Sequence, residues 1–101
     1  MRVGIVGGVE RQEPDLHRIA ERAGHEVEFH SGHVRGRGQE TLASLVERCD
    51  LVVIVTDVNS HGAVRGARDL ARRRGRTAVV TRKFGPSRLS MLFAQGVSAL
   101  S

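Results

Sequence analysis

The sequence predicts a three-layer α/β fold of the Rossmann-like or flavodoxin-like kind, built on a four-stranded parallel sheet. Short apolar segments alternate regularly with segments of helical periodicity along all 101 residues, a pattern typical of parallel sheets with crossover helices. The apolar segment 51–55 has no polar alternation, which indicates a strand buried on both faces. The polar segment 56–62 follows it directly, at the edge where open α/β sheets bind ligands.

The chain begins with a short apolar segment, Val3 to Val6, which predicts the first strand. Gly7 and Gly8 follow it and allow a tight turn with close backbone approach. The spacing of Gly4, Gly7 and Gly8 is not G-x-G-x-x-G, so a dinucleotide fingerprint is not supported.

A helix, a strand and a second helix are predicted next. Pro14 suits a first helical turn, and Gly24 is expected to end that helix. Glu26 to His30 alternates polar and apolar residues, as an edge strand half open to water does. After a loop rich in Gly and Arg, the second helix is expected to begin at Glu40 or Thr41.

The second half of the chain repeats this alternation. A helix with its apolar stripe inward follows the central strand and ends at Gly75; the stripe residues are Ala63, Val64, Ala67, Leu70 and Ala71. Residues 77–81 predict the fourth strand. Ser87 is the expected N-cap of a last helix that ends near Gly96.

The alternation predicts one domain over residues 1–101 with right-handed crossovers and the strand order 2-1-3-4. The switch point then lies between the first and third strands, beside Gly7, Gly8, Ser60 and His61. Four strands leave two open edges, which proteins usually cover. We therefore expect a homodimer or a higher homo-oligomer.

Composition limits the classes of function. The single Cys49 excludes an internal disulfide and a C-x-x-C-H covalent haem site, and it fits a reducing cytosol. No apolar segment approaches the roughly 20 residues that cross a bilayer, and no signal peptide is predicted, so we expect a cytoplasmic protein. The net charge of +5 allows an anionic partner. We do not expect a nucleic-acid partner, because the chain lacks Trp and Tyr for base stacking.

Histidines are the strongest candidates for chemistry. His61 is expected in the first turn of the third helix, where the helix dipole keeps the imidazole neutral and able to ligate a metal. His30 ends the second strand at the same edge and can face the same crevice. His33 follows three residues later, so His30, His33 and His61 together form a possible site for a metal-dependent enzyme.

Basic residues near the last helix are candidates for anion binding. Arg82 and Lys83 follow the fourth strand, and Arg88 lies in the first turn of the last helix. Together with Ser87 at the helix N-terminus they can hold a phosphate or a carboxylate. A module that binds a small phosphate-type ligand through Gly7–Gly8, Ser60 and Arg82 is therefore a second hypothesis, which needs no iron.

The sequence resembles a bacterial family, domain of unknown function 2325. The matching features are the opening RVGIVGG, the FHSG that ends the second strand, the central DLVVIVTDVNSHGA, and the final Arg-x-x-Gly-x-Ser-x-Leu from Arg82 to Leu89. Val58 and the Arg and Gly residues of 35–38 depart from the family pattern.

The resemblance implies a self-associating Rossmann-like protein that binds haem b non-covalently and binds dioxygen or another small diatomic ligand. It makes His61 the expected iron ligand and His30 a distal or alternative ligand. Arg82, Lys83 and Arg88 are then expected to pair with the haem propionates, and Phe29, Phe84 and Phe93 to contact the macrocycle. This hypothesis favours an oxygen carrier, store or sensor over an enzyme.

Overall fold

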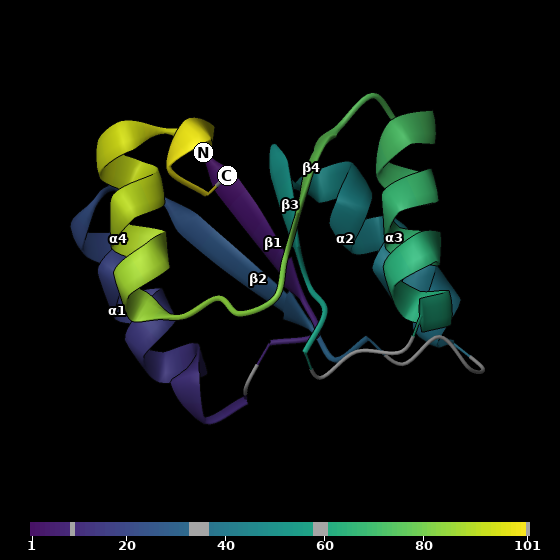
Figure 1. Ribbon diagram of the computed structural model, residues 1–101, viewed down its shortest axis with the longest axis horizontal. Coiled ribbons are helices and arrows are strands. Elements are labelled where there is room, and N and C mark those ends of the chain that lie inside the picture. Colours follow the sequence, from purple (N-terminus) through teal and green to yellow (C-terminus); the bar gives the residue numbers. More distant parts are fainter. Residues whose placement is uncertain (9, 33–36, 58–60, 101) are drawn as a thin grey trace.

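The computed structural model describes residues 1–8, 10–32, 37–57 and 61–100, the side chains of His61 and Ala99 excepted. Its centre is a four-stranded parallel sheet with the order β2-β1-β3-β4 (Figure 1). The strands are β1 (Arg2–Val6), β2 (Glu26–His30), β3 (Leu51–Val55) and β4 (Thr77–Thr81). The predicted fold class and strand order are thus confirmed.

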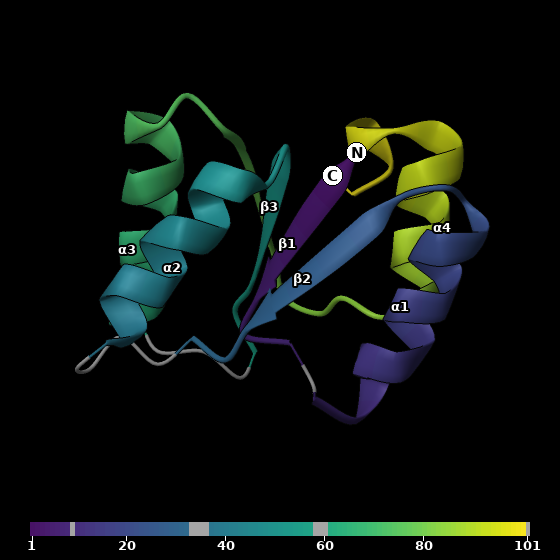
Figure 2. The same cartoon turned by 180° about the vertical axis from the view of Figure 1, so that it is seen from behind.

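Helices cover both faces of the sheet. α1 (Glu13–Arg22) and α4 (Pro86–Gln95) lie together on one face, and α2 (Gly38–Arg48) and α3 (His61–Arg73) lie on the other (Figures 1 and 2). Two 3₁₀ helices, Glu10–Gln12 and Val97–Leu100, precede α1 and follow α4. This arrangement follows from right-handed crossovers, because α1 connects strands in the direction opposite to α2 and α3.

The side chains of β1 and β3 alternate between two hydrophobic clusters. Val3, Ile5, Leu51 and Val53 pack toward α1 and α4, whereas Val6, Val52 and Ile54 pack toward α2 and α3. All five residues of β3 are buried, as expected for a strand covered on both faces. The central strands therefore provide the rigid platform from which the carboxyl-edge loops extend.

The edge strands are more exposed than the central pair. In β2 only Val27 is buried, and the ion pair between Arg48 Nη2 and Glu28 Oε1 at 2.7 Å lies on its polar face. In β4 only Thr81 is buried, although its sequence is mainly apolar. Charged side chains protect one edge of the sheet, and the other edge presents apolar side chains.

Helix ends differ from the sequence expectations at two places. The expected start of the second helix at Glu40 or Thr41 is wrong, because α2 begins at Gly38 with its N-cap at Arg37. Ser87 is not the N-cap of α4, since Gly85 takes that position and Pro86 begins the helix. Proline has no backbone N–H to lose in a first turn, which explains why the helix starts there.

Candidate functional site

A pocket lies at the carboxyl edge of the sheet, beside the segment that joins the end of β4 to the start of α4, whose course Figure 1 shows. Its volume is about 340 Å³, within the usual range for small-molecule sites. We call it the arginine pocket; its lining residues are Gln12, Val55, Asp57, Arg82, Lys83, Phe84, Gly85 and Arg88. Ligand sites of open α/β sheets occur at this edge, because the loops that leave parallel strands converge there.

The segment after β4 shapes this pocket. The Thr81 hydroxyl donates a hydrogen bond to the Lys83 backbone carbonyl at 3.1 Å, which tightens the turn out of the strand. Phe84 is only 4% exposed and joins the core cluster under α1 and α4. A Cβ on Gly85 would lie 3.4 Å from Gln12 Nε2, so the 3₁₀ helix before α1 closes over the start of α4.

Three cations of the pocket differ in how they are held. Arg82 is 87% exposed and pairs with Asp57 at 3.6 Å, which is a loose surface contact. Lys83 is also exposed. Arg88 is partly buried, and its Nε atom is buried without a hydrogen-bond partner among the described residues. A buried guanidinium N–H without an acceptor lowers the stability of the folded protein. Arg88 is therefore the residue of this pocket that most needs an external acceptor.

His30 is already engaged in hydrogen bonds through both ring nitrogens. Its Nδ1 accepts the Gly32 backbone N–H at 3.0 Å, so the neutral ring carries its proton on Nε2. Nε2 lies 3.0 Å from the Gly38 carbonyl and 3.0 Å from Thr41 Oγ1, and it donates to one of them. In this arrangement His30 joins the end of β2 to the start of α2 and has no free nitrogen for a metal.

The remaining predicted site residues are only partly described. His61 is the first residue of α3, as predicted, but its side chain lies outside the described part of the chain. Ser60 and His33 also lie outside the described residues. Among the described residues, no group of three or more His, Cys, Asp and Glu can hold a metal ion.

The glycine turn after β1 is separate from the arginine pocket. Gly7 has φ 82°, and its N–H donates to the His30 carbonyl at 2.8 Å. A Cβ on Gly8 would lie 3.2 Å from Ile5 Cγ2, so the Gly8 backbone lies close to the Ile5 side chain. Neither glycine lines the pocket, and neither does His30. The structure thus brings together Arg82, Lys83 and Arg88, and leaves the glycine turn on the β1–β2 side of the edge.

Sequence reasoning did not identify Gln12, Val55 and Gly85 as pocket residues. Gln12 comes from a 3₁₀ turn with no distinctive motif, and only tertiary packing brings it beside Gly85. Of the three phenylalanines, only Phe84 lines this pocket. Phe29 and Phe93 pack against the α1–α4 cluster, where they contact the rings of His17 and His25.

In the described ranges, no helix is long and apolar enough to cross a bilayer.

Comparison with known proteins gives a family but no established activity. The family described as "Uncharacterized protein conserved in bacteria (DUF2325)" matches residues 2–95. The chain is also similar to a UPF0751 protein of Desulfitobacterium hafniense (strain Y51), with 31% identity over 75 residues, covering 72% of this chain and 71% of that protein. No solved structure matches the chain.

Proposed function

This chain belongs to the DUF2325 family of bacterial proteins, and we propose that it binds an anionic ligand with an apolar body in the arginine pocket. The observation that carries the proposal is the buried, unpartnered Nε of Arg88. A buried donor without an acceptor costs about 1–3 kcal/mol, and more when it is charged. Arg88 lines the pocket, so a carboxylate or phosphate oxygen there would pair with its guanidinium group, and a small rotation of the side chain would let the ligand accept the buried Nε–H as well.

The surroundings of Arg88 suit both parts of such a ligand. Val55 and Phe84 provide apolar surface, while Arg82 and Lys83 add positive charge at the rim. The first turn of α4 adds the positive end of a helix dipole, which also favours an anion. The ligand would place its charged group against Arg88 and its apolar part over Phe84.

We further propose haem b as that ligand, as the family resemblance implies. Arg82, Lys83 and Arg88 fit the haem propionates. Because both ring nitrogens of His30 are engaged, His61 is the iron ligand in this proposal. A ferrous haem would supply reversible binding of dioxygen or another diatomic molecule.

A pocket of about 340 Å³ in one chain is small for a macrocycle. In the haem proposal the ring therefore extends beyond the pocket and is covered by a second subunit. The expected homodimer or higher homo-oligomer is part of the same proposal. Its assembly would be measured by analytical ultracentrifugation with and without haem.

The test is a titration of the purified protein with haem, followed by the Soret band. A shifted band in the parent protein and in His17→Ala, lost in His61→Ala, would support the proposal. His17 is an exposed histidine of α1 and serves as a matched control. No Soret shift, or a shift unchanged in His61→Ala, would contradict haem ligation by His61.

A phosphate-type ligand is the second candidate, favoured by the same Arg88 nitrogen. The backbone N–H of Gly7 already donates to the His30 carbonyl. Gly7 therefore adds less to phosphate binding than the sequence suggested. Calorimetry with inorganic phosphate and with phosphate monoesters, in protein free of iron, separates this candidate from haem. Arg88→Met should abolish the signal, whereas Arg22→Met, a change of an exposed arginine in α1, should leave it unchanged.

A further inference from the structure

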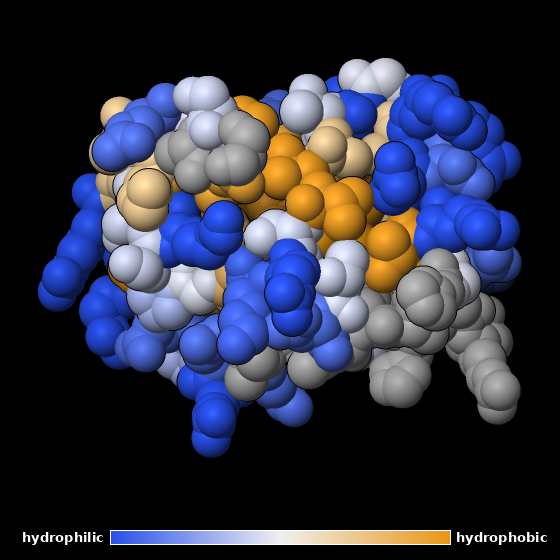
Figure 3. All heavy atoms as spheres, viewed as in Figure 1, coloured by the Kyte–Doolittle hydropathy of each residue, from blue (hydrophilic) through white to orange (hydrophobic). Residues whose placement is uncertain are grey.

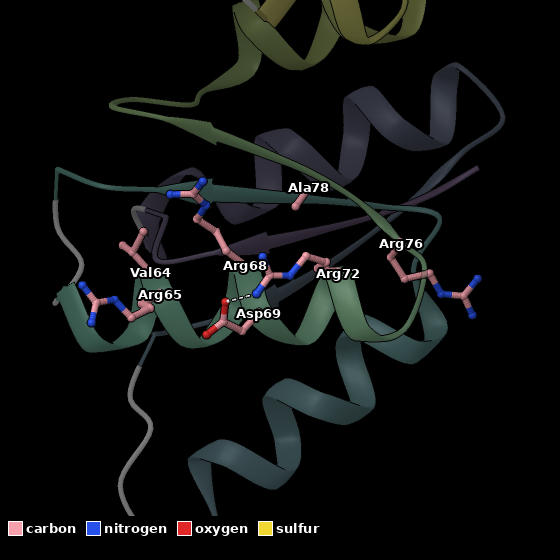
Figure 4. Close-up of a pocket in the computed structure, with 7 residues that line it drawn as sticks. All are labelled: Val64, Arg65, Arg68, Asp69, Arg72, Arg76 and Ala78. Atoms are coloured by element: carbon pink, nitrogen blue, oxygen red, sulfur yellow. Dashed lines mark hydrogen bonds and ion pairs between the residues drawn. The ribbon is translucent and has the colours of Figure 1, made fainter.

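A second, larger hollow lies on the other face of the sheet, between α3 and β4. It has a volume of about 710 Å³ and does not share a lining residue with the arginine pocket. We call it the α3–β4 groove. Figure 4 shows arginine side chains of α3 along one wall, with Ala78 of β4 on the other. The inference drawn from this groove is independent of the proposed ligand of the arginine pocket.

Ala78 forms the β4 side of the groove, and Val80, two residues further along β4, lies beside the groove on the same face of the sheet. Ala78 and Val80 pair in register with Val52 and Ile54, which are fully buried on the same face. Ala78 and Val80 are nevertheless exposed, and 42% of Val80 is accessible. Figure 3 shows the resulting apolar band on this side of the molecule, next to the basic surface of α3. An apolar surface at the open edge of a sheet is a typical place for a partner to bind.

The α3 wall carries excess positive charge. Arg65, Arg68 and Arg72 form one stripe along the helix, spanning about 10 Å at 1.5 Å per residue. Arg72 Nη2 bonds Asp69 Oδ1 at 3.2 Å and stays 81% exposed. Within the described part of the chain, Arg65 and Arg68 have no ion-pair or hydrogen-bond partner. Two guanidinium groups are thus available to carboxylates.

We propose that the α3–β4 groove docks an acidic amphipathic helix of a partner protein. The apolar side of that helix covers Ala78 and Val80, and its carboxylates pair with Arg65, Arg68 and Arg72. Acidic residues spaced by three or four positions form a matching stripe on the partner helix. The apolar contact supplies the free energy of burial, and the arginines supply orientation and a faster association rate.

Charge and chemistry argue against two other occupants. Pairing this groove with the same groove of a second copy would place arginine against arginine. A nucleic-acid backbone has no apolar face to cover Val80. Its bases would find no aromatic side chain to stack on in the groove lining, which consists of Val, Ala, Arg and Asp. An acidic, partly apolar protein segment matches both walls.

The probe is a fluorescein-labelled helical peptide of about 16 residues, long enough to keep some helix in solution. It carries a leucine stripe flanked by glutamates. We expect saturable binding by fluorescence anisotropy to the full chain. A scrambled peptide of the same composition should bind at least about tenfold more weakly, because it cannot present both faces at once.

Variants then locate the binding site. Arg68→Ser should weaken peptide binding by about fivefold to tenfold, and Arg65→Ser by a similar factor. The control Arg73→Ser removes the same charge from the same helix, but Arg73 lines a different hollow beside α2, so the change should be less than about twofold. Val80→Thr keeps the β-branched shape and should weaken binding by roughly threefold through lost apolar contact. Circular dichroism checks that each variant is folded.

Several outcomes would overturn the inference. Absence of saturable peptide binding below about 1 mM would reject it, as would equal effects of Arg73→Ser and Arg68→Ser. Tighter binding of a DNA duplex than of the peptide, with no response to Val80→Thr, would identify the groove as a nucleic-acid surface. A dimer whose dissociation constant changes in Val80→Thr or Arg68→Ser would show that a second copy occupies it.

Discussion

Replacing Gly4 by alanine should destabilise the protein strongly. Gly4 lies in β1 and faces α2, and a Cβ there would overlap Leu45 Cδ2 and lie 2.9 Å from Cys49 Sγ. Both neighbours are buried, with 2% and 1% exposure. Carbon atoms pack at about 3.5–4.0 Å, so α2 must move away from the sheet or Leu45 must change its rotamer.

The magnitude follows from two opposing effects. Overpacking a tight core costs roughly 1–3 kcal/mol, and two crowded neighbours favour the upper end. Alanine also lowers the conformational entropy of the unfolded chain, which raises the free energy of unfolding by about 0.5–1 kcal/mol. The free energy of unfolding should therefore fall by about 2 kcal/mol, which lowers the Tm of a domain this size by roughly 8–16 °C.

Urea unfolding followed by far-UV circular dichroism measures this change. Gly66→Ala is the matched control, because Gly66 lies inside α3 and nothing stands within 4 Å of an added Cβ. That change should stabilise the protein by about 0.5–1 kcal/mol. A double-mutant cycle with Leu45→Ala should show a coupling of at least about 1 kcal/mol. If Gly4→Ala stays within about 0.5 kcal/mol of the parent, β1 and α2 are not packed as described.

Three further results are expected. The hydrogen bond from Arg48 lowers the pKa of Glu28 below its ordinary value of 4.5. The ionised Glu28 therefore stabilises the folded protein fully above pH 4.5, and this contribution is lost as the pH falls through the lowered pKa. Glu28→Gln should reduce the free energy of unfolding by about 0.5–1 kcal/mol at pH 7 and flatten the acid limb of the stability profile. Burial raises the pKa of the Cys49 thiol to about 11, so a thiol reagent at pH 8 should label it only as fast as the chain unfolds; rapid labelling of the folded protein would disagree. Gly75 has φ 67° with open space around it, so Gly75→Ala should lower the unfolding free energy by about 1–2 kcal/mol through backbone strain alone, and a neutral result in the urea assay would contradict this.

Local sequence patterns were sufficient for the architecture. The uninterrupted apolar segment 51–55 favours a strand covered on both faces, and it is β3 at the centre of the sheet. Gly24, Gly75 and Gly96 follow helices and have positive φ, as expected of residues that end them. The regular alternation of strands and helices predicted a parallel sheet, and the strand order 2-1-3-4 expected for such a doubly wound sheet is the one observed.

The candidate site was only partly predictable. Arg82, Lys83 and Arg88 were expected near the carboxyl edge, because they follow a strand and begin a helix. The sequence could not show that Arg88 Nε is buried without a partner, since burial depends on residues distant in the chain. His30 looked like a free ligand at the end of a strand, but the start of α2 lies close enough to engage its Nε2.

By itself, then, the sequence determined the strands and helices, the glycines that end the helices and the fold class. These features depend on periodicity, turn chemistry and the handedness of connections between neighbouring elements. Only the tertiary structure decided which side chains meet. Gln12 reaches Gly85 across the sheet edge, and the arginines of α3 stand over an apolar β4 that a covering helix would ordinarily bury. Such pairings arise from packing between distant segments, where a shift of a few ångströms decides whether a cation, a donor or an apolar face is exposed.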